Sequence, residues 1–102
     1  MTQVLPTHDS VKTCSNSGVL AADAAVKSGA GVVYWLTVND AADLAIELND
    51  SADDSGTDLW AMKLDVDVVN FAHFVFDPPI YFGTGIWLDV STATCQVIIG
   101  YA

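Results

Sequence analysis

Apolar and polar residues alternate with a period of two along much of this chain. The clearest case is Leu44–Leu48, in which three large aliphatic side chains alternate with Ala45 and Glu47. Such alternation places one side of an extended strand in a core and the other in water. The stretch Val32–Asn39 adds the β-branched and aromatic side chains that strands favour. The pattern therefore predicts β-strands.

Turn residues separate these strands at short, regular intervals. The segment Asp77-Pro78-Pro79 is predicted to break one strand, because proline cannot donate to a β-ladder. The predicted strands are Gly18–Val26, Val32–Asn39, Leu44–Leu48, Leu59–Val68, Phe71–Phe76, Ile80–Phe82, Ile86–Val90 and Thr94–Tyr101. About seven or eight short strands indicate an all-β fold, a single small β-sandwich with jelly-roll or Greek-key connections.

The first 17 residues differ from the rest of the chain. Met1–Ser17 has no sustained period, contains Pro6 and ends in a Ser/Asn cluster before Gly18, which is typical of an extended arm. A chain of 102 residues has room for one hydrophobic core and not for two. We therefore expect an N-terminal arm (residues 1–17) that reaches a neighbouring molecule, followed by one β-sandwich domain (residues 18–102).

The composition is unusually apolar for a small domain. The chain is 52% hydrophobic and 16% charged, whereas ordinary soluble domains carry about 25% charged residues. The stretches free of formal charge, Ser28–Asn39 and Val90–Ala102, are shorter than the roughly 20 residues of a membrane-spanning helix. The amino terminus does not resemble a secretory signal. We therefore expect no membrane partner, and burial of the apolar excess against other subunits.

Charge excludes another class of partner. The chain has 13 acidic residues, three lysines and no arginine, for a formal net charge of −10. Affinity for nucleic acid comes from Lys and Arg at the phosphates, so nucleic-acid binding is disfavoured. An acidic surface keeps a protein soluble until a partner covers its apolar patches.

The side chains that could carry chemistry lack the required arrangements. Cys14 and Cys95 have no paired short spacing for zinc, and buried free thiols are favoured over a disulfide between them. His8 and His73 have no nucleophile in a triad context, so we expect no catalysis, and His73 is interpreted as packed or at an interface. Asp65 and Asp67 share one face of a predicted strand and are expected to face water.

The acidic loop after Leu48 is the one candidate for a metal. Calcium takes several oxygen ligands from one flexible loop, and the candidate ligands are Asp50, Asp53, Asp54 and Asp58. The helix-loop-helix calcium pattern fails here, because aligning Gly56 with the required glycine places Met62 where a bidentate Glu belongs. A solvated hairpin loop is favoured, and we expect no metal and no cofactor.

Aromatic side chains are the candidates for binding. Three tryptophans in a domain of this size cannot all lie in the core, and Trp and Tyr are enriched at interfaces. They could also form a platform for a sugar. The interface candidates are Val4 and Leu5 in the arm, and Trp35, Trp60, Phe74, Tyr81 and Trp87 in the domain.

From about Ser28 to the carboxyl terminus the sequence resembles small phage and prophage β-sandwich proteins encoded among virion structural genes. The features that carry the resemblance are Ser28–Val33 leading into Leu36–Asn39, then Ile46–Ser51 with Ser55–Thr57, then Phe82–Leu88 and the final strand Thr94–Tyr101. The arm and the Ala-rich first strand depart from that pattern.

The resemblance implies a capsid decoration (cement) or head-fibre protein, often trimeric. Such a protein is made in the host cytoplasm, sits on the virion shell and binds its own copies and the major capsid protein. The alternative function is a carbohydrate- or receptor-binding module that uses exposed aromatics and the acidic loop, with or without Ca²⁺.

Overall fold

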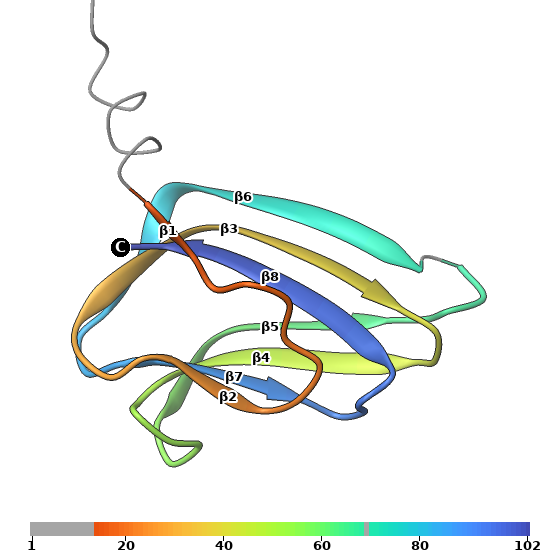
Figure 1. Cartoon of the computed structure of the whole chain (residues 1–102), viewed down its shortest axis with the longest axis horizontal. Helices are drawn as coiled ribbons and strands as arrows, with labels where there is room; N and C mark the ends of the chain where they lie inside the picture. Colours follow the sequence, from red (N-terminus) through yellow and green to blue (C-terminus); the bar gives the residue numbers. More distant parts are fainter. Residues whose placement is uncertain (1–13, 69) are drawn as a thin grey trace, which may run out of the picture.

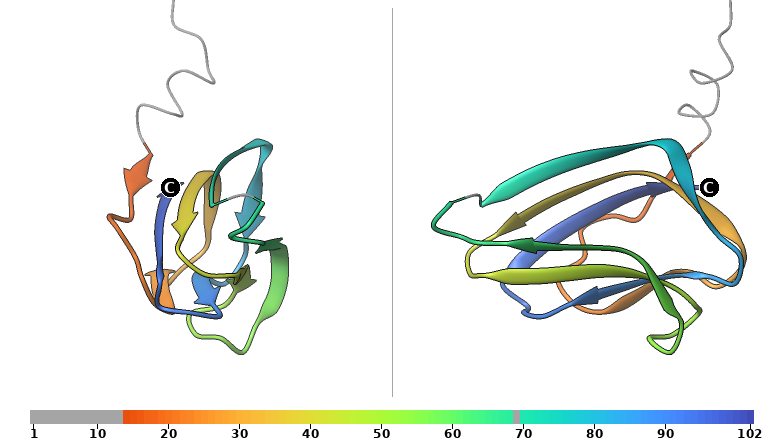
Figure 2. Two further views of the ribbon diagram at one scale, coloured as in Figure 1. Left: turned by 90° about the vertical axis from the view of Figure 1, so that its right-hand side faces the viewer. Right: turned by 180° about the vertical axis from the view of Figure 1, so that it is seen from behind.

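The computed structural model describes residues 14–68 and 70–102, which form two β-sheets packed face to face (Figures 1 and 2). The strands are β1 (Ser15–Asn16), β2 (Ala24–Lys27), β3 (Gly31–Asp40), β4 (Leu44–Asp50), β5 (Thr57–Leu64), β6 (Phe71–Phe82), β7 (Ile86–Val90) and β8 (Cys95–Tyr101). The all-β prediction is confirmed. Within these ranges no helix is long and apolar enough to cross a membrane.

The strand order is that of a jelly roll. The two antiparallel sheets have the orders β1-β8-β3-β6 and β2-β7-β4-β5. β1 pairs with β8, β2 with β7, β3 with β6 and β4 with β5, so the chain resembles one long hairpin with its tip at residues 51–56. This hairpin is rolled up, because every connection except β4–β5 passes from one sheet to the other. Eight strands connected in this way form a jelly roll, which is one of the two kinds of connection predicted from the sequence.

The core lies between the central strands of the two sheets, β3 and β8 on one side and β4 and β7 on the other. Burial of each large apolar side chain there stabilises the fold by about 1.5–3 kcal/mol. The largest fully buried side chains of the core come mostly from alternate positions of the strands. They are Val33, Leu36, Val38, Leu44, Ile46, Leu48, Phe82, Ile86, Leu88, Val97 and Ile99. The intervening residues are directed to the two outer faces.

Aromatic side chains fill the gap between the edge strands β5 and β6. The Trp60 ring meets the Phe74 ring at a centroid distance of 5.1 Å and the Phe76 ring at 5.6 Å, both edge to face. All three pack against the core. These contacts join the two sheets along the edge that β5 and β6 form.

The predicted strand break at Pro78 and Pro79 is wrong, because β6 is continuous from Phe71 to Phe82. The peptide bond between Asp77 and Pro78 is cis. Proline is tolerated here for two reasons. β6 is at the end of its sheet, and the prolines lie opposite a shift in register between Val33 and Trp35.

The strand predicted over Leu59–Val68 ends at Leu64. Asp65 and Asp67 are therefore not on a strand face as predicted. They lie in a turn in which the Val68 N–H donates to the Asp65 carbonyl (2.9 Å) and the Asp67 N–H donates to Asp65 Oδ1 (2.9 Å). Val68 is 78% exposed, so the inward alternation predicted for it does not occur.

The predicted first strand, Gly18–Val26, is shorter and begins later, as β2. The residues before it run along β8 instead. Leu20 exchanges two backbone hydrogen bonds of 2.8 Å with Val97, and the Ser17 N–H donates to the Ile99 carbonyl at 2.9 Å. The segment then passes to the other sheet (Figure 1).

The last part of the predicted arm thus pairs with the sandwich. Ser15 lies opposite Tyr101, and Asn16 lies opposite Gly100. The boundary that we predicted after Ser17 falls within this paired segment. The rest of the arm, with Val4 and Leu5, lies outside the described residues.

Removing residues 1–17 should destabilise the protein more than removing residues 1–13. The longer deletion removes β1 and two hydrogen bonds between Ser17 and Ile99. At about 1 kcal/mol for each net hydrogen bond, we expect a difference of about 2–3 kcal/mol in the free energy of unfolding. Urea denaturation of the two truncated proteins measures it, and equal midpoints would show that β1 contributes nothing.

Candidate functional site

One outer face of the sandwich carries three rows of side chains across β6, β3 and β8. Directly opposed residues in neighbouring strands share a face. The strand pairings therefore place three triplets side by side: Phe71–Asn39–Gln96, His73–Thr37–Ile98 and Val75–Trp35–Gly100. None of the nine carries a formal charge with histidine neutral. We call these nine residues the uncharged face.

Contacts between these rows hold the face together. Thr37 Oγ1 and His73 Nδ1 share a hydrogen bond of 2.6 Å, and Asn39 Nδ2 donates to Gln96 Oε1 at 3.3 Å. The Trp35 ring lies 6.0 Å from the His73 ring, centroid to centroid. The Trp35 indole also covers the backbone of Gly100, where a Cβ would overlap it. Polar groups on the face are thereby paired with one another.

The edge strand carries the most exposed part of this surface. Phe71 is 71% exposed, Val75 is 69% exposed, and Tyr81, which lies opposite Val32 beyond the register shift, is 66% exposed. Large apolar side chains exposed together on one surface mark sites of contact with another molecule. These three follow one strand and form a stripe, which the exposed Asp77, Pro78 and Pro79 interrupt between Val75 and Tyr81.

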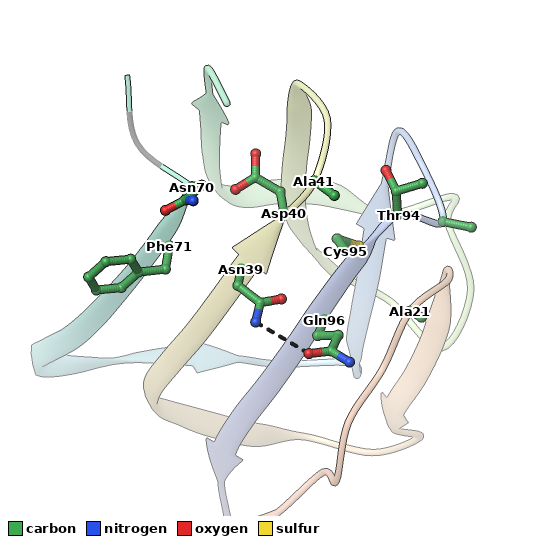
Figure 3. Close-up of a pocket in the computed structure, with 10 residues that line it drawn as sticks. Ala21, Asn39, Asp40, Ala41, Asn70, Phe71, Thr94, Cys95 and Gln96 are labelled. Atoms are coloured by element: carbon green, nitrogen blue, oxygen red, sulfur yellow. Dashed lines mark hydrogen bonds between the residues drawn. The ribbon is translucent and has the colours of Figure 1, made fainter. Parts of the chain in front are cut away.

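A pocket of about 790 Å³ opens at the end of the uncharged face. Figure 3 shows Asn39 and Gln96 joined by their hydrogen bond on one side of the pocket, and Phe71 and Asn70 from β6 and its preceding turn on another. Thr94 and Cys95 line it from the start of β8. An aromatic ring beside amide groups can contact a polar ligand with an apolar side.

Two buried groups, Asp40 and Cys95, line this pocket. Burial raises the pKa of the Cys95 thiol, and the nearby Asp40 carboxylate raises it further. Cys95 is accordingly a thiol that donates to the Thr92 carbonyl (3.3 Å) and is not a nucleophilic thiolate. The Asp40 carboxylate is buried, and neither of its oxygens has a hydrogen-bond partner among residues 14–68 and 70–102. Cys14 is half-buried, and neither cysteine forms a disulfide.

The carboxylates of the acidic loop are directed to different partners. Asp50 Oδ1 accepts from the backbone N–H of Thr84 (2.7 Å) and of Gly85 (3.3 Å), and these donors hold the pKa of Asp50 below its ordinary value. Asp53 Oδ1 accepts from Ser51 Oγ (2.9 Å) and the Ser55 N–H (2.8 Å), and the Ser55 contacts are the main cause of its lowered pKa.

Asp58 lies elsewhere, on the outer face of the second sheet with Glu47 and Asp89. A hydrogen bond with Asp58 raises the pKa of Glu47. Burial raises the pKa of Asp89, and the charges of Asp23, Asp54 and Asp58 add to the effect. Across the described ranges, no three His, Cys, Asp or Glu side chains are placed to hold a metal ion. We call Asp23, Glu47, Asp54, Asp58 and Asp89 the acidic surface.

The structure separates the predicted interface residues. Trp35 and Tyr81 lie on the outside of the first sheet, whereas Trp60 and Phe74 pack against each other between the sheets. Trp87 lies on the second sheet opposite Asn49, half-buried, with its Nε1 unpartnered among the described residues. Among the predicted interface residues within the described ranges, only Trp35 and Tyr81 lie on the outside of the first sheet.

Sequence reasoning missed several residues of that surface, namely Phe71, Val75, Asn39 and Gln96. The alternation in β3 contains the signal for one of them, because Thr37 and Asn39 alternate with the buried Leu36 and Val38. Their neighbours on β6 and β8 could not be found in this way. Strand order, which brings the three strands together, is not encoded in any local pattern.

Replacing Gly100 with alanine should destabilise the protein. The new Cβ would overlap the Trp35 indole, and overpacking of this kind costs about 1–3 kcal/mol. Gly29→Ala is the matched control, since a Cβ there meets no atom within 4 Å. Urea denaturation of both variants tests the contact. Equal midpoints for the two variants would mean that Trp35 does not pack on Gly100.

Asp50→Asn should lower stability at neutral pH and have a diminishing effect in acid. The folded state lowers the pKa of Asp50, so its contribution is complete above the unfolded-state pKa and is lost as the pH falls through the folded-state value. Thermal melts from pH 7 down to pH 2 measure the difference from wild type. Asp77→Asn, at an exposed position, is the control. A difference that persists unchanged at the lowest pH would contradict the assignment.

No family model, curated protein or solved structure matches this chain. The structural observations that bear on its function are therefore the uncharged face, the pocket at its end and the acidic surface on the opposite sheet. Of these three, the uncharged face has the most exposed apolar side chains, and it is the strongest candidate for contact with a partner.

Proposed function

We propose that this chain is a structural protein of a phage virion, a capsid decoration protein that stabilises the shell through non-covalent contacts. The observation that carries the proposal is the stripe of exposed Phe71, Val75 and Tyr81 on a domain with a net charge of −10. The acidic charge is sufficient to keep the domain soluble, and an exposed apolar stripe does not add to solubility. A subunit that binds other proteins, in contrast, requires an exposed apolar surface.

Two further points support this function. Jelly rolls are a common architecture of viral capsid domains and of lectins, which is support by analogy at the level of the fold. The sequence resemblance to virion β-sandwich proteins selects the first of these two uses. The proposed partners are the major capsid protein and other copies of the chain, three copies being what the resemblance implies.

The physical basis of decoration is the summation of weak contacts. A subunit that bridges neighbouring shell proteins holds each of them by several weak contacts, and once one contact forms the others become intramolecular. Small interfaces on a small domain are then sufficient for stable attachment to the shell. No covalent chemistry is required of the subunit, and its location would be the virion.

A carbohydrate- or receptor-binding module is the second candidate. The specific observation in its favour is the pocket, where the Phe71 ring lies near the amides of Asn39, Gln96 and Asn70. Aromatic rings contact the apolar faces of sugars, and amides can pair with hydroxyl groups. Such binding could take place with or without Ca²⁺.

The purified protein should bind capsids of the phage that encodes it. We expect saturable co-sedimentation with a fixed number of copies per capsid, and decorated capsids that resist heating better than bare ones. The 1–13 deletion, which keeps β1, should bind more weakly if the arm with Val4 and Leu5 reaches a neighbouring molecule.

Two results would contradict the virion proposal. One is the absence of co-sedimentation at any protein concentration. The other is binding to a glycan array that is lost in Phe71→Ala and kept in Val68→Ala, since Phe71 lines the pocket and Val68 is equally exposed in a turn outside it. That second result would establish the carbohydrate-binding function.

A further inference from the structure

We infer that the pocket at the end of the uncharged face binds an arginine side chain of another protein, with the Asp40 carboxylate receiving its guanidinium group. Two observations define the site: a buried carboxylate without a partner, and a pocket that this carboxylate lines. The identity of the other protein as the capsid protein rests on the proposed function, whereas the chemistry of the site does not.

The Asp40 carboxylate is a buried group whose hydrogen-bonding capacity is unused. Asp40 is 8% exposed, and neither of its side-chain oxygens has a partner among residues 14–68 and 70–102. The large majority of buried polar side-chain atoms have a partner, and buried charges are paired. After burial, the Asp40 charge is the next cause of the raised pKa of the Cys95 thiol. This carboxylate therefore lacks donors, and a ligand can supply them.

The backbone around Asp40 is held on both sides. The Asp40 N–H donates to the Asn70 carbonyl (2.9 Å), and the Ala41 N–H donates to the Thr94 carbonyl (3.0 Å). These two bonds fix the end of β3 between the segments that begin β6 and β8. Because the backbone is already ordered, a ligand does not have to order it, which lowers the cost of binding.

The pocket extends from the outer face around the end of β3. Asn39 and Asp40 are the last two residues of this strand, so their side chains point to opposite sides of it (Figure 3). Both residues line the pocket. A partner that lies on the outer face therefore needs a long side chain to bring a charged group to Asp40. Arginine has such a side chain, with an apolar stem and a charged end.

The lining of the pocket suits this side chain. Three alanines and Phe71 provide apolar surface for the stem. The Asn39 amide donates its NH₂ group to Gln96, so its Oδ1 can accept from the remaining N–H groups of a guanidinium. The volume of about 790 Å³ lies within the range of ligand pockets, about 300–1,000 Å³.

The two unpartnered oxygens favour a guanidinium group over an ammonium group or a metal ion. A guanidinium donates two parallel N–H groups to the two oxygens of one carboxylate, and it is less strongly hydrated than an ammonium. Asp40 is the one acidic residue among the described residues that line the pocket. Calcium takes about six to eight oxygen ligands, often from several carboxylates.

The sequence also decides which molecule supplies the arginine. The chain has no arginine of its own. A second copy of the chain therefore cannot provide the guanidinium group, and the partner is a different protein.

Titration of the isotope-labelled full chain with Nα-acetyl-L-arginine methylamide, followed by NMR, tests the inference. We expect saturable shifts of the amide signals of Asp40 and Ala41. The matched ligand control is Nα-acetyl-L-citrulline methylamide, which has the same shape and a neutral urea group. It should bind about tenfold more weakly or less, because it lacks the charge-assisted hydrogen bonds.

Three results with the wild type would overturn the inference. They are equal binding of the arginine and citrulline compounds, tighter binding of the corresponding lysine compound, and binding of Ca²⁺ that displaces the arginine compound from the same signals. This comparison needs no variant, so it is decisive whether or not a substitution at Asp40 affects folding.

A pair of variants tests the role of the carboxylate. Asp40→Asn keeps the shape of the side chain and removes its charge, and it should bind the arginine compound about tenfold more weakly or less. Asp77→Asn removes the same charge at an exposed position outside the pocket and should bind like the wild type. Circular dichroism checks the fold of both. Equal affinity in wild type and a folded Asp40→Asn variant would overturn the assignment.

The capsid experiment separates this inference from the proposed function. Binding of the arginine compound that depends on Asp40, in a protein that never binds capsids, would refute the function and leave the site intact. Absence of that binding, together with equal capsid binding by wild type and Asp40→Asn, would refute the site and leave the function intact.

Discussion

The rest of this structure depends on the burial of one side of four central strands between two sheets. Leu36 and Val38 of β3 belong to the same core as Ile46 and Leu48 of β4, and all four are fully buried. Because strand side chains alternate, each inward residue sends its neighbours outward. Because Leu36 and Val38 point into the core, Thr37 between them points to the outer face. The composition of both outer faces is thus a consequence of the register that the core selects.

The two outer faces differ in charge, since the uncharged face has no formal charge and the acidic surface has five carboxylates. Acidic residues gather on the second sheet, around Glu47 and Asp89, which lie directly opposite each other. Like charges so placed destabilise a sheet slightly. Their charges repel other anionic surfaces, whereas the nine residues of the uncharged face do not.

Local patterns predicted the core strands well and the periphery poorly. The alternation in Leu44–Leu48 needs no partner to be recognised, and β4 contains it. The prolines in β6 misled the prediction because their cost depends on whether the strand is at an edge, which only the sheet order decides. The prediction of the residues at the candidate site failed for the same reason. Trp35 and Trp60 are both tryptophans on strands, but only the topology places one outside and the other between the sheets.

The edge strand also determines how another molecule can approach. β6 ends its sheet, so its outer backbone groups could pair with a strand from another copy, the usual hazard of an edge. Pro78 and Pro79 remove two donors, and the register shift opposite them bends the strand, so a flat, continuous ladder cannot form along its whole length. Contact with another molecule would therefore involve the side chains of the face more readily than the backbone edge. A backbone ladder accepts almost any strand, whereas a face with Phe71 and Val75 at fixed positions requires a complementary surface. The prolines of β6 therefore disfavour unspecific pairing along this edge.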